Sequence, residues 1–371
     1  MTSKRLKVLF WMPYHGRIPG GHQVQLVETS RALSVLGVDT SDSYDPDPPL
    51  ADFDLVHGFG LTPLDILKCR ESGRPVVSSP IYWGRSYTTS GPRSDRTTRV
   101  VLRDWVGRSW RGFRYFAASL RGRGPLIRLM LEEASTDLEQ IAAYSMADLL
   151  LVNAKGEGAN IRHELGVVTP TRIVPNAVNT SRFSPYFESV REARSLICVG
   201  RLEPHKNQLG LIKALKGVDD VKITIVGPDH PDHPRYRDAC RRAAGANVSF
   251  LPNVQHEQLA ELYAAHRVHA LPSWYETTGL VSLEAAAAGC AVVTTDRGHA
   301  REYFGSDAWY CDPAHPASIR DAVLQALQHG PSAELARRVA TEFSWEETAR
   351  QTLAGYRYVL ERGCPEPRAR S

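Results

Sequence analysis

Short apolar runs rich in β-branched residues alternate along the chain with stretches of helical periodicity. Most of these runs are continuously apolar, which indicates strands buried on both faces of a parallel sheet covered by helices. The fold class is therefore expected to be α/β, with doubly wound parallel sheets. Strands are predicted over residues 8–12, 54–57, 75–78, 149–152, 171–174, 195–199, 222–226, 248–251, 268–271, 291–295 and 309–311.

The chain is expected to form two domains, because 371 residues exceed what one core usually organises. A polar, aperiodic stretch over 179–194 marks the boundary, since a new strand begins directly after it. The predicted parts are an N-terminal Rossmann-like domain over 1–180, a C-terminal one over 190–344, an amphipathic helix over 345–363 and a disordered tail over 364–371. In such domains, ligands bind at the carboxyl ends of the strands.

Composition restricts the class of protein. Apolar residues make up 42% of the chain and charged residues 23%, as in globular proteins. No apolar run approaches the roughly 20 residues that cross a bilayer, and the apolar stretch interrupted by Lys7 is interpreted as a first core strand rather than a signal peptide. The six scattered cysteines lack disulfide or metal spacing, which favours a reduced, cytoplasmic protein.

The net charge of +4 conceals a strongly basic segment. From Arg85 to Arg128, eleven arginines face only two aspartates, within a predicted insertion over 82–131. The arginines are interleaved with aromatic residues, which fits contact with an anionic membrane surface or a lipid-linked acceptor. A solvated insertion is an equally weighted alternative. Nucleic acid is not expected, because no recognition motif accompanies the basic residues.

Two cations follow the predicted strand 195–199. Arg201 offers a planar fork for phosphate oxygens, Lys206 offers a compact charge, and Gly200 leaves room for a ligand. The alternative is a solvated loop, with Asn207 as the N-cap of the next helix.

Two glutamates bracket the start of a predicted helix, in Glu276-Thr277-Thr278-Gly279-Leu280-Val281-Ser282-Leu283-Glu284. Free amides at a helix start suit a diphosphate. The two glutamates would lie roughly 12 Å apart along a helix, about the span from a transferred sugar to a ribose on one nucleotide sugar. A plain surface position is disfavoured for Glu284, because alanines surround it and a nearly buried carboxylate needs a partner.

Two further motifs carry weaker signals. Gly20 and Gly21 follow the first strand and let backbone amides approach a phosphate or sugar, although a plain turn explains them about equally well. They form neither a Walker A motif nor a Gly-x-Gly-x-x-Gly fingerprint. His230 and His233 fit no closed metal site, so a proline-rich loop is preferred there.

In their order and spacing, these motifs resemble the retaining GT-B glycosyltransferases of family 4, also called glycosyl transferases group 1, from end to end. The matching segments are Gly20-Gly21, 54–57, 174–179 with Phe183, 199–201 with Lys206-Asn207, 272–276, Glu284-Ala285, Gly289 with Val292-Val293, Glu302, and 343–345.

The resemblance implies transfer of a hexose-type sugar from a UDP- or GDP-sugar to a glycan, lipid-linked or small-molecule hydroxyl. It implies a GT-B fold with two domains facing a cleft and a C-terminal helix that returns to the N-terminal domain. It further implies a front-face, configuration-retaining reaction without metal or cofactor, and a role in polysaccharide biosynthesis. We expect a cytoplasmic location, peripheral at the inner membrane face if the basic segment binds lipid.

The resemblance also assigns roles to residues. Arg201 and Lys206 would neutralise the leaving diphosphate. Glu276 would act with them in catalysis, and His57 would face the cleft as a fourth catalytic residue. The donor would be held by Gly20, Gly21, Gly200, Asn253, Val254, Thr278, Gly279, Leu280 and Glu284. Tyr82 and Trp83 stand where many members carry a cleft histidine, so they are candidates for contact with the sugar or the acceptor.

The chain departs from the family pattern at Thr277-Thr278, where Gly-Phe is usual, which leaves the donor sugar open. Ala291 and Asn179 replace a usual proline and aspartate at positions interpreted as structural. Two alternative functions remain: a nucleotide-sugar epimerase or sugar phosphorylase of the same architecture, and an inactive nucleotide-sugar-binding protein.

Overall fold

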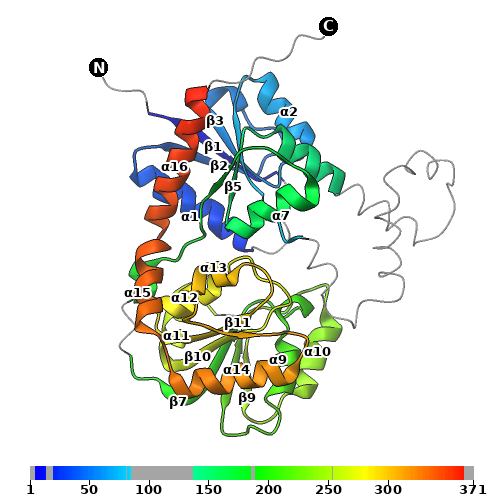
Figure 1. The fold of residues 1–371 in the computed structure, drawn as a ribbon, viewed down its shortest axis with the longest axis vertical. Coiled ribbons are helices and arrows are strands. Elements are labelled where there is room, and N and C mark those ends of the chain that lie inside the picture. Colours follow the sequence, from blue (N-terminus) through cyan, green and yellow to red (C-terminus); the bar gives the residue numbers. More distant parts are fainter. Residues whose placement is uncertain are drawn as a thin grey trace, which may run out of the picture. The chain divides into compact units, whose positions relative to one another are not determined.

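A computed structural model describes residues 5–13, 20–80, 82–84, 137–184, 189–252 and 254–362 of the chain (Figure 1). The segment from Arg85 to Arg128, Asn253 and the tail 364–371 lie outside these residues. The expectations placed on the basic insertion and on the tail therefore stay predictions.

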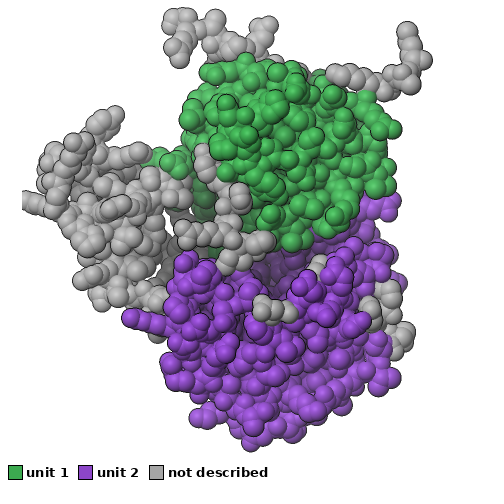
Figure 2. All heavy atoms as spheres, turned by 180° about the vertical axis from the view of Figure 1, so that it is seen from behind, with its two compact units in different colours: residues 1–174, 349–371 green, residues 175–348 purple. Residues whose placement is uncertain are grey.

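The chain divides into two compact units, coloured separately in Figure 2. Unit 1 comprises Met1–Val174 together with Ala349–Ser371, and unit 2 comprises Pro175–Thr348. The last helix, α16 (Trp345–Arg362), therefore begins in unit 2 and contributes most of its length to unit 1.

Unit 1 contains a six-stranded sheet with the order β2-β1-β3-β4-β5-β6, in which every pair of neighbouring strands is parallel. Its described elements before α16 are β1 (Lys7–Trp11), α1 (Gly21–Val35), β2 (Asp39–Ser43), η1 (Leu50–Asp52), β3 (Leu55–Phe59), α2 (Pro63–Glu71), β4 (Val76–Ser79), β5 (Leu149–Val152), α7 (Lys155–Leu165) and β6 (Thr171–Ile173).

The inner strands β1 and β5 of unit 1 are almost continuously apolar, because both faces of the sheet are buried there. In β1, Val8 and Phe10 join one hydrophobic cluster, whereas Leu9 and Trp11 join a second cluster. The first cluster also includes Tyr356 and other residues of α16, so this helix covers one face of the sheet of unit 1. The expected return of the C-terminal helix to the N-terminal domain is thereby confirmed.

Unit 2 repeats the architecture, with a parallel sheet in the order β12-β11-β10-β7-β8-β9. Its described strands are β7 (Glu192–Val199), β8 (Lys222–Val226), β9 (Val248–Leu251), β10 (His266–Leu271), β11 (Ala291–Thr295) and β12 (Trp309–Cys311). Its described helices are α8 (Thr180–Phe183), η4 (Pro204–Lys206), α9 (Gln208–Ala214), α10 (Pro234–Ala243), α11 (His256–Ala265), α12 (Leu280–Ala287), α13 (Ala300–Phe304), α14 (Pro316–His329) and α15 (Ala333–Glu342).

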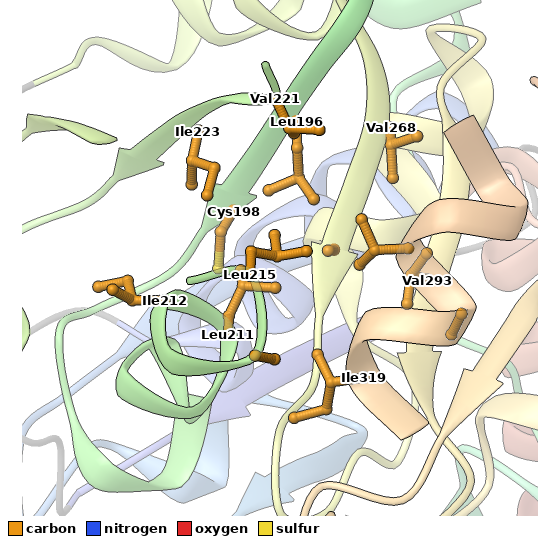
Figure 3. Packing of buried hydrophobic residues seen from close by; sticks show 14 of the residues in the cluster. Leu196, Cys198, Leu211, Ile212, Leu215, Val221, Ile223, Val268, Val293 and Ile319 are labelled. Carbon is orange, nitrogen blue, oxygen red and sulfur yellow. The ribbon is translucent and has the colours of Figure 1, made fainter. Parts of the chain in front are cut away.

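One hydrophobic core of unit 2 lies between its central strands and the helices α9 and α14. Leu196 and Cys198 of β7 point into it, and Leu211 of α9 and Ile319 of α14 close it from the helical side (Figure 3). This packing fixes the carboxyl ends of β7 and β10, after which the candidate site begins.

All eleven predicted strands are present to within a few residues. A twelfth strand, β2, was not predicted. Its sequence, Asp39-Thr40-Ser41-Asp42-Ser43, is polar because β2 is an edge strand whose residues are exposed or half-buried. Its register with β1 is set by backbone hydrogen bonding, which leaves no apolar signal in the sequence.

Candidate functional site

The site in unit 2 begins where β7 ends, at a close approach of two backbones. Gly200 follows β7, and Gly227 follows β8 with a φ of +137°. A Cβ atom on Gly227 would lie 2.3 Å from the carbonyl oxygen of Gly200. Only glycine therefore fits at residue 227, and the turn that carries Arg201 is held against the neighbouring strand.

Arg201 is oriented by groups on both sides of it. Its Nη2 donates to Oε1 of Glu203 at 3.4 Å, and its carbonyl oxygen accepts from the side chain of Gln208 at 2.7 Å. Glu203 is buried, and its other oxygen lies 3.7 Å from Nε2 of His230. The guanidinium keeps about a third of its side-chain surface exposed, so it can still reach a phosphate.

Lys206 and Glu276 form an ion pair at the centre of the site. Nζ of Lys206 donates to Oε1 of Glu276 at 2.7 Å, with side-chain exposures of 20% and 8%. Burial by itself would raise the pKa of Glu276, but the charge and hydrogen bond of Lys206 outweigh it and the pKa is lowered. Glu276 is therefore a carboxylate at neutral pH, ready to accept hydrogen bonds from hydroxyl groups.

Backbone hydrogen bonds connect the two loops that carry this ion pair. The amide of Trp274 donates to the carbonyl oxygen of His205 at 2.9 Å, one residue before Lys206. Glu276 is further fixed by its own backbone, which accepts from the amide of His299 at 2.9 Å and donates to Arg297 at 3.2 Å.

The backbone contact between Glu276 and the segment 297–299 is sterically possible because residue 298 is glycine. Gly298 forms a parallel bridge with Glu276, and its φ is +102°. A Cβ atom on Gly298 would lie 2.2 Å from the carbonyl oxygen of Glu276. The position of the Glu276 carboxylate therefore depends on a glycine 22 residues further along the chain.

The N-terminus of α12 supplies backbone amides beside the ion pair. Gly279 is the N-cap with a φ of +75°, and Leu280 is the first helical residue. Nδ2 of Asn176 donates to the hydroxyl of Thr278 at 3.1 Å, and the backbone amide of Asn176 donates to the hydroxyl of Tyr303 at 3.1 Å. The first amides of a helix have no partner inside the helix, so they are suited to bind an anionic oxygen.

Glu284 lies about one turn into α12 and is nearly buried. The hydroxyl of Tyr263 donates to its Oε2 at 3.4 Å and also to the carbonyl oxygen of Val281 at 3.0 Å. The structure therefore brings Gly200, Lys206, Glu276 and the start of α12 together, with Glu284 on the same helix. The functions assigned to these residues stay predictions.

Asn207 is the N-cap residue of α9, as the alternative interpretation expected, but its side chain does not make the capping hydrogen bond. Asn207 has a left-handed conformation with a φ of 56°, and its side chain makes no capping hydrogen bond. Its Nδ2 donates instead to the carbonyl oxygen of Pro313 at 3.0 Å. Asn207 thus ends the loop of Lys206 and begins α9, with its carboxamide beside Gly210 in the first turn but without a capping hydrogen bond.

Three of the remaining predicted donor residues fall in described parts of the chain. Gly20 is the N-cap of α1 and Gly21 is its first residue, and a Cβ atom on Gly20 would meet nothing within 4 Å. Val254 follows β9 and is half-buried, whereas Asn253 lies outside the described residues. The roles of these residues stay predictions.

His57 does not face a surface that a substrate can reach. It lies in β3 with 2% of its surface exposed, its Nδ1 2.7 Å from the hydroxyl of Tyr356 and its Nε2 2.9 Å from the hydroxyl of Ser79. Because both ring nitrogens are used inside the core of unit 1, His57 is a structural residue that fixes α16 to the sheet. The expectation of a catalytic His57 is corrected.

Burial makes His57 a source of acid sensitivity. It lowers the pKa of this histidine to about 3, so the folded chain keeps the imidazole neutral where the unfolded chain binds a proton. Stability from this group is complete above the unfolded pKa of about 6.5 and declines as the pH falls toward 3. By pH 4.5 the loss reaches about 3 kcal/mol.

We therefore expect the unfolding free energy of a His57→Gln variant to change less between pH 7 and pH 4.5 than that of the parent chain, by about 2–3 kcal/mol. Urea denaturation at the two pH values measures this difference. His329→Gln, which removes an exposed imidazole, is the matched control and should keep the parent's pH dependence. Equal pH dependence in the His57 variant and the parent would contradict the assignment.

The structure describes both Tyr82 and Trp83 in unit 1, and it anchors Tyr82. Tyr82 is buried in a hydrophobic cluster, and its hydroxyl donates to Oε2 of Glu164 at 2.8 Å. A ring fixed in this way belongs to the core, so Tyr82 is corrected as a sugar-contacting candidate. Trp83 is half-buried and stays a candidate.

Three positioning residues of the site were missed from the sequence. Gly298 and Asn176 are distant in the chain from the residues they hold, and Glu203 lies in the short loop between Arg201 and Lys206 with no sequence signal for its contact with Arg201. An isolated glycine after a predicted strand was the one available signal for Gly298, but it does not identify the contact with Glu276.

Among the described residues, no group of three or more His, Cys, Asp and Glu side chains is arranged to hold a metal ion. His230 and His233 lie side by side, with ring centroids 4.7 Å apart. Across the described part of the chain, none of the helices has the length and apolarity needed to cross a membrane.

The turn of Arg201 and Lys206, the Glu276 loop and α12 all fall within one matched segment of the chain. Residues 185–342 match the family described as Glycosyl transferases group 1. The match covers unit 2 almost completely and does not extend to unit 1.

Two curated proteins to which this chain is similar are glycosyltransferases. D-inositol 3-phosphate glycosyltransferase of Geodermatophilus obscurus is 32% identical over 253 residues, which are 60% of this chain and 55% of that protein. MMP alpha-(1->4)-mannosyltransferase of Mycolicibacterium hassiacum is 27% identical over 325 residues, which are 84% of this chain and 72% of that protein. The chain thus spans little more than half the length of the inositol phosphate enzyme.

Solved structures extend the likeness from the group 1 segment to both units. Sucrose-phosphate synthase from Thermosynechococcus elongatus superposes with a TM-score of 0.70 at 17% identity, over 97% of this chain and 100% of that one. HepE of Anabaena, solved in complex with UDP and glucose, superposes with a TM-score of 0.65 at 14% identity, over 95% and 99%. With two Rossmann-like units, the chain has the expected GT-B fold.

Proposed function

We propose that the protein is a retaining glycosyltransferase of family 4 that transfers a hexose-type sugar from a UDP- or GDP-sugar to a hydroxyl group of a glycan, a lipid-linked saccharide or a small molecule. The observation that carries the proposal is the buried Lys206–Glu276 ion pair beside the N-terminus of α12. The group 1 match of residues 185–342 and the glycosyltransferase relatives support it.

A buried ion pair rarely stabilises a fold by itself, because removing both charges from water offsets most of their attraction. Its presence at the carboxyl ends of β7 and β10 is better explained by a ligand that carries both an anionic group for the lysine and hydrogen-bond donors for the glutamate. A nucleotide sugar does so, since its diphosphate would bind Lys206 and its sugar hydroxyls would bind Glu276.

The neighbouring groups complete the proposed donor site. Arg201 binds the diphosphate from the other side, and the amides of Gly279 and Leu280 contact its oxygens. Glu284 accepts hydrogen bonds from the ribose hydroxyls, while the base lies against the segment of Asn253 and Val254. The two side-chain cations neutralise the charge that develops on the leaving diphosphate, which is the task a bound metal performs in other transferases.

In the proposed reaction, the bond from the anomeric carbon to the diphosphate oxygen breaks as the acceptor oxygen bonds to that carbon on the same face. The acceptor proton passes to the departing phosphate oxygen, so the chain needs no separate base. Configuration at the anomeric carbon is retained, and the products are the glycosylated acceptor and the nucleoside diphosphate.

Calorimetry with UDP and GDP, followed by the common UDP- and GDP-hexoses, tests the donor assignment. We expect either UDP or GDP to bind, and a sugar nucleotide with the same base to be turned over in the presence of EDTA. NMR couplings report the anomeric configuration of the product, which we expect to be that of the donor. An epimerised donor without transfer would favour the epimerase, and binding without turnover would favour an inactive binding protein. Inverted product would contradict the retaining mechanism.

A further inference from the structure

Unit 2 contains a second concave site, whose lining includes none of the proposed donor residues. A groove of about 510 Å³ runs beside β12, the last strand at one edge of the sheet, and is bordered by α13 and α14. Its polar and aromatic lining consists of Arg301, Trp309, Tyr310, Ser318, Asp321 and Gln325. The volume falls within the range of small-ligand sites.

The helical wall of the groove follows from helix periodicity. Ser318, Asp321 and Gln325 are spaced by three and four residues along α14, so they lie on one face. Ile319 and Val323 occupy the opposite face and are buried in the core of unit 2 (Figure 3 shows Ile319). Asp321 and Gln325 are exposed, and among the described residues neither side chain forms an ion pair or hydrogen bond.

The strand wall presents two aromatic rings that are held in place. Trp309 is half-buried and packs on the core of unit 2, which leaves the rest of its indole at the groove. The hydroxyl of Tyr310 donates to the carbonyl oxygen of Gly305 at 2.7 Å. The guanidinium carbon of Arg301 lies 3.8 Å from the centre of the Tyr310 ring.

Stacking on Tyr310 fixes the orientation of Arg301 without using its hydrogen-bonding capacity. A guanidinium carries five N–H groups, all in its plane, and a ring below that plane leaves them available. No ion pair engages Arg301 in the described part of the chain, although the residue is exposed. The groove thus combines rigid aromatic surfaces with donors and acceptors that a ligand can use.

We propose that this groove binds a neutral oligosaccharide. A pyranose ring has a C–H face that packs on an aromatic side chain and a rim of hydroxyls that both donate and accept hydrogen bonds. The exposed part of the Trp309 indole matches the former, and Asp321, Gln325 and Arg301 match the latter.

Charge argues against other small ligands. The lining contains one cation, Arg301, and one carboxylate, Asp321, so its formal charge is zero. A phosphate or polyanion would face Asp321 without a second cation, and an amine would face Arg301. A neutral, hydroxyl-rich ligand satisfies both groups at once. The site would hold a saccharide chain on unit 2 independently of the donor.

Binding of three neutral hexasaccharides, maltohexaose, cellohexaose and α-1,6-mannohexaose, tests this site by saturation-transfer NMR and calorimetry. We expect at least one to bind the full chain, and an Asp321→Ala/Gln325→Ala variant to bind it roughly tenfold more weakly or worse. Both changes are on an exposed helix face, so folding should be retained. Gln328→Ala, exposed on the same helix but outside the groove, is the matched control and should bind as the parent does.

The outcomes separate this inference from the proposed transferase activity. If the double variant loses saccharide binding but keeps nucleotide-sugar affinity, the groove is a distinct saccharide site, and this result holds whether or not the chain proves to be a transferase. The inference is overturned if none of the three hexasaccharides binds, or if the double variant binds them as tightly as the parent. It is also overturned if the parent binds uridine or adenosine and the double variant does not.

Discussion

Replacement of Lys206 by alanine is expected to lower the rate of sugar transfer by roughly 10²–10³-fold, because it removes a fixed positive charge from the leaving diphosphate. In the free protein the same ammonium is 2.7 Å from Glu276. Turnover of the nucleotide sugar identified by calorimetry, measured at saturating donor, reports the loss. Lys213→Ala removes an exposed lysine of α9 in the same unit and should leave the rate unchanged.

The same substitution also tests the ion pair itself. Without Lys206, Glu276 is a buried carboxylate that has lost its cation, and an orphaned buried charge costs on the order of 3–5 kcal/mol. We therefore expect Lys206→Ala to be less stable toward urea than the parent. The double variant Lys206→Ala/Glu276→Gln removes the orphan and should recover most of this stability while its activity stays low.

The pair of measurements distinguishes a catalytic loss from an unfolded protein. Recovery of stability without recovery of rate means that the two residues act on the substrate. If Lys206→Ala turned over the donor at the parent rate, the donor site proposed in unit 2 would be refuted, whatever its stability.

The donor site was predictable from the sequence to the extent that it is local. Arg201 and Lys206 are in one turn after a strand, and Glu276 to Glu284 span one loop and helix, so spacing and strand position determine which sheet edge carries them. The tertiary restraint on Glu276 was not predictable, because Gly298 contacts it only after β11 has paired with β10.

His57 illustrates the opposite error. A histidine at the carboxyl end of a predicted strand favours a ligand site, and local sequence offers no other partner for it. Its actual partner, Tyr356, follows 299 residues later and comes from the helix that covers this face of the sheet. Because side chains alternate along β3, the His57 ring lies in the core beside Phe10 and Phe59. A side chain buried in this way cannot contact a substrate.

Replacement of Gly298 by alanine is expected to abolish detectable donor binding and to destabilise unit 2 on the order of 3 kcal/mol, since backbone strain and a steric clash add together. The new Cβ would lie 2.2 Å from the carbonyl oxygen of Glu276 and 3.1 Å from its amide nitrogen, at a φ of +102°. The atoms that clash with the new Cβ belong to the backbone of Glu276, so the clash is relieved only if this backbone moves. The Glu276 carboxylate would then leave the position from which it faces Lys206.

Gly217→Ala is the matched control, because it imposes the same kind of strain without the clash. Gly217 has a φ of +82° in the same unit, and a Cβ atom there would meet nothing within 4 Å. This variant should lose only about 1–2 kcal/mol of stability and bind the nucleotide sugar as the parent does. Urea denaturation and calorimetry on both variants measure the contrast. If the Gly298→Ala and Gly217→Ala variants had equal stability and equal donor affinity, backbone strain alone would account for the behaviour of each variant. The contact of Gly298 would then not position Glu276.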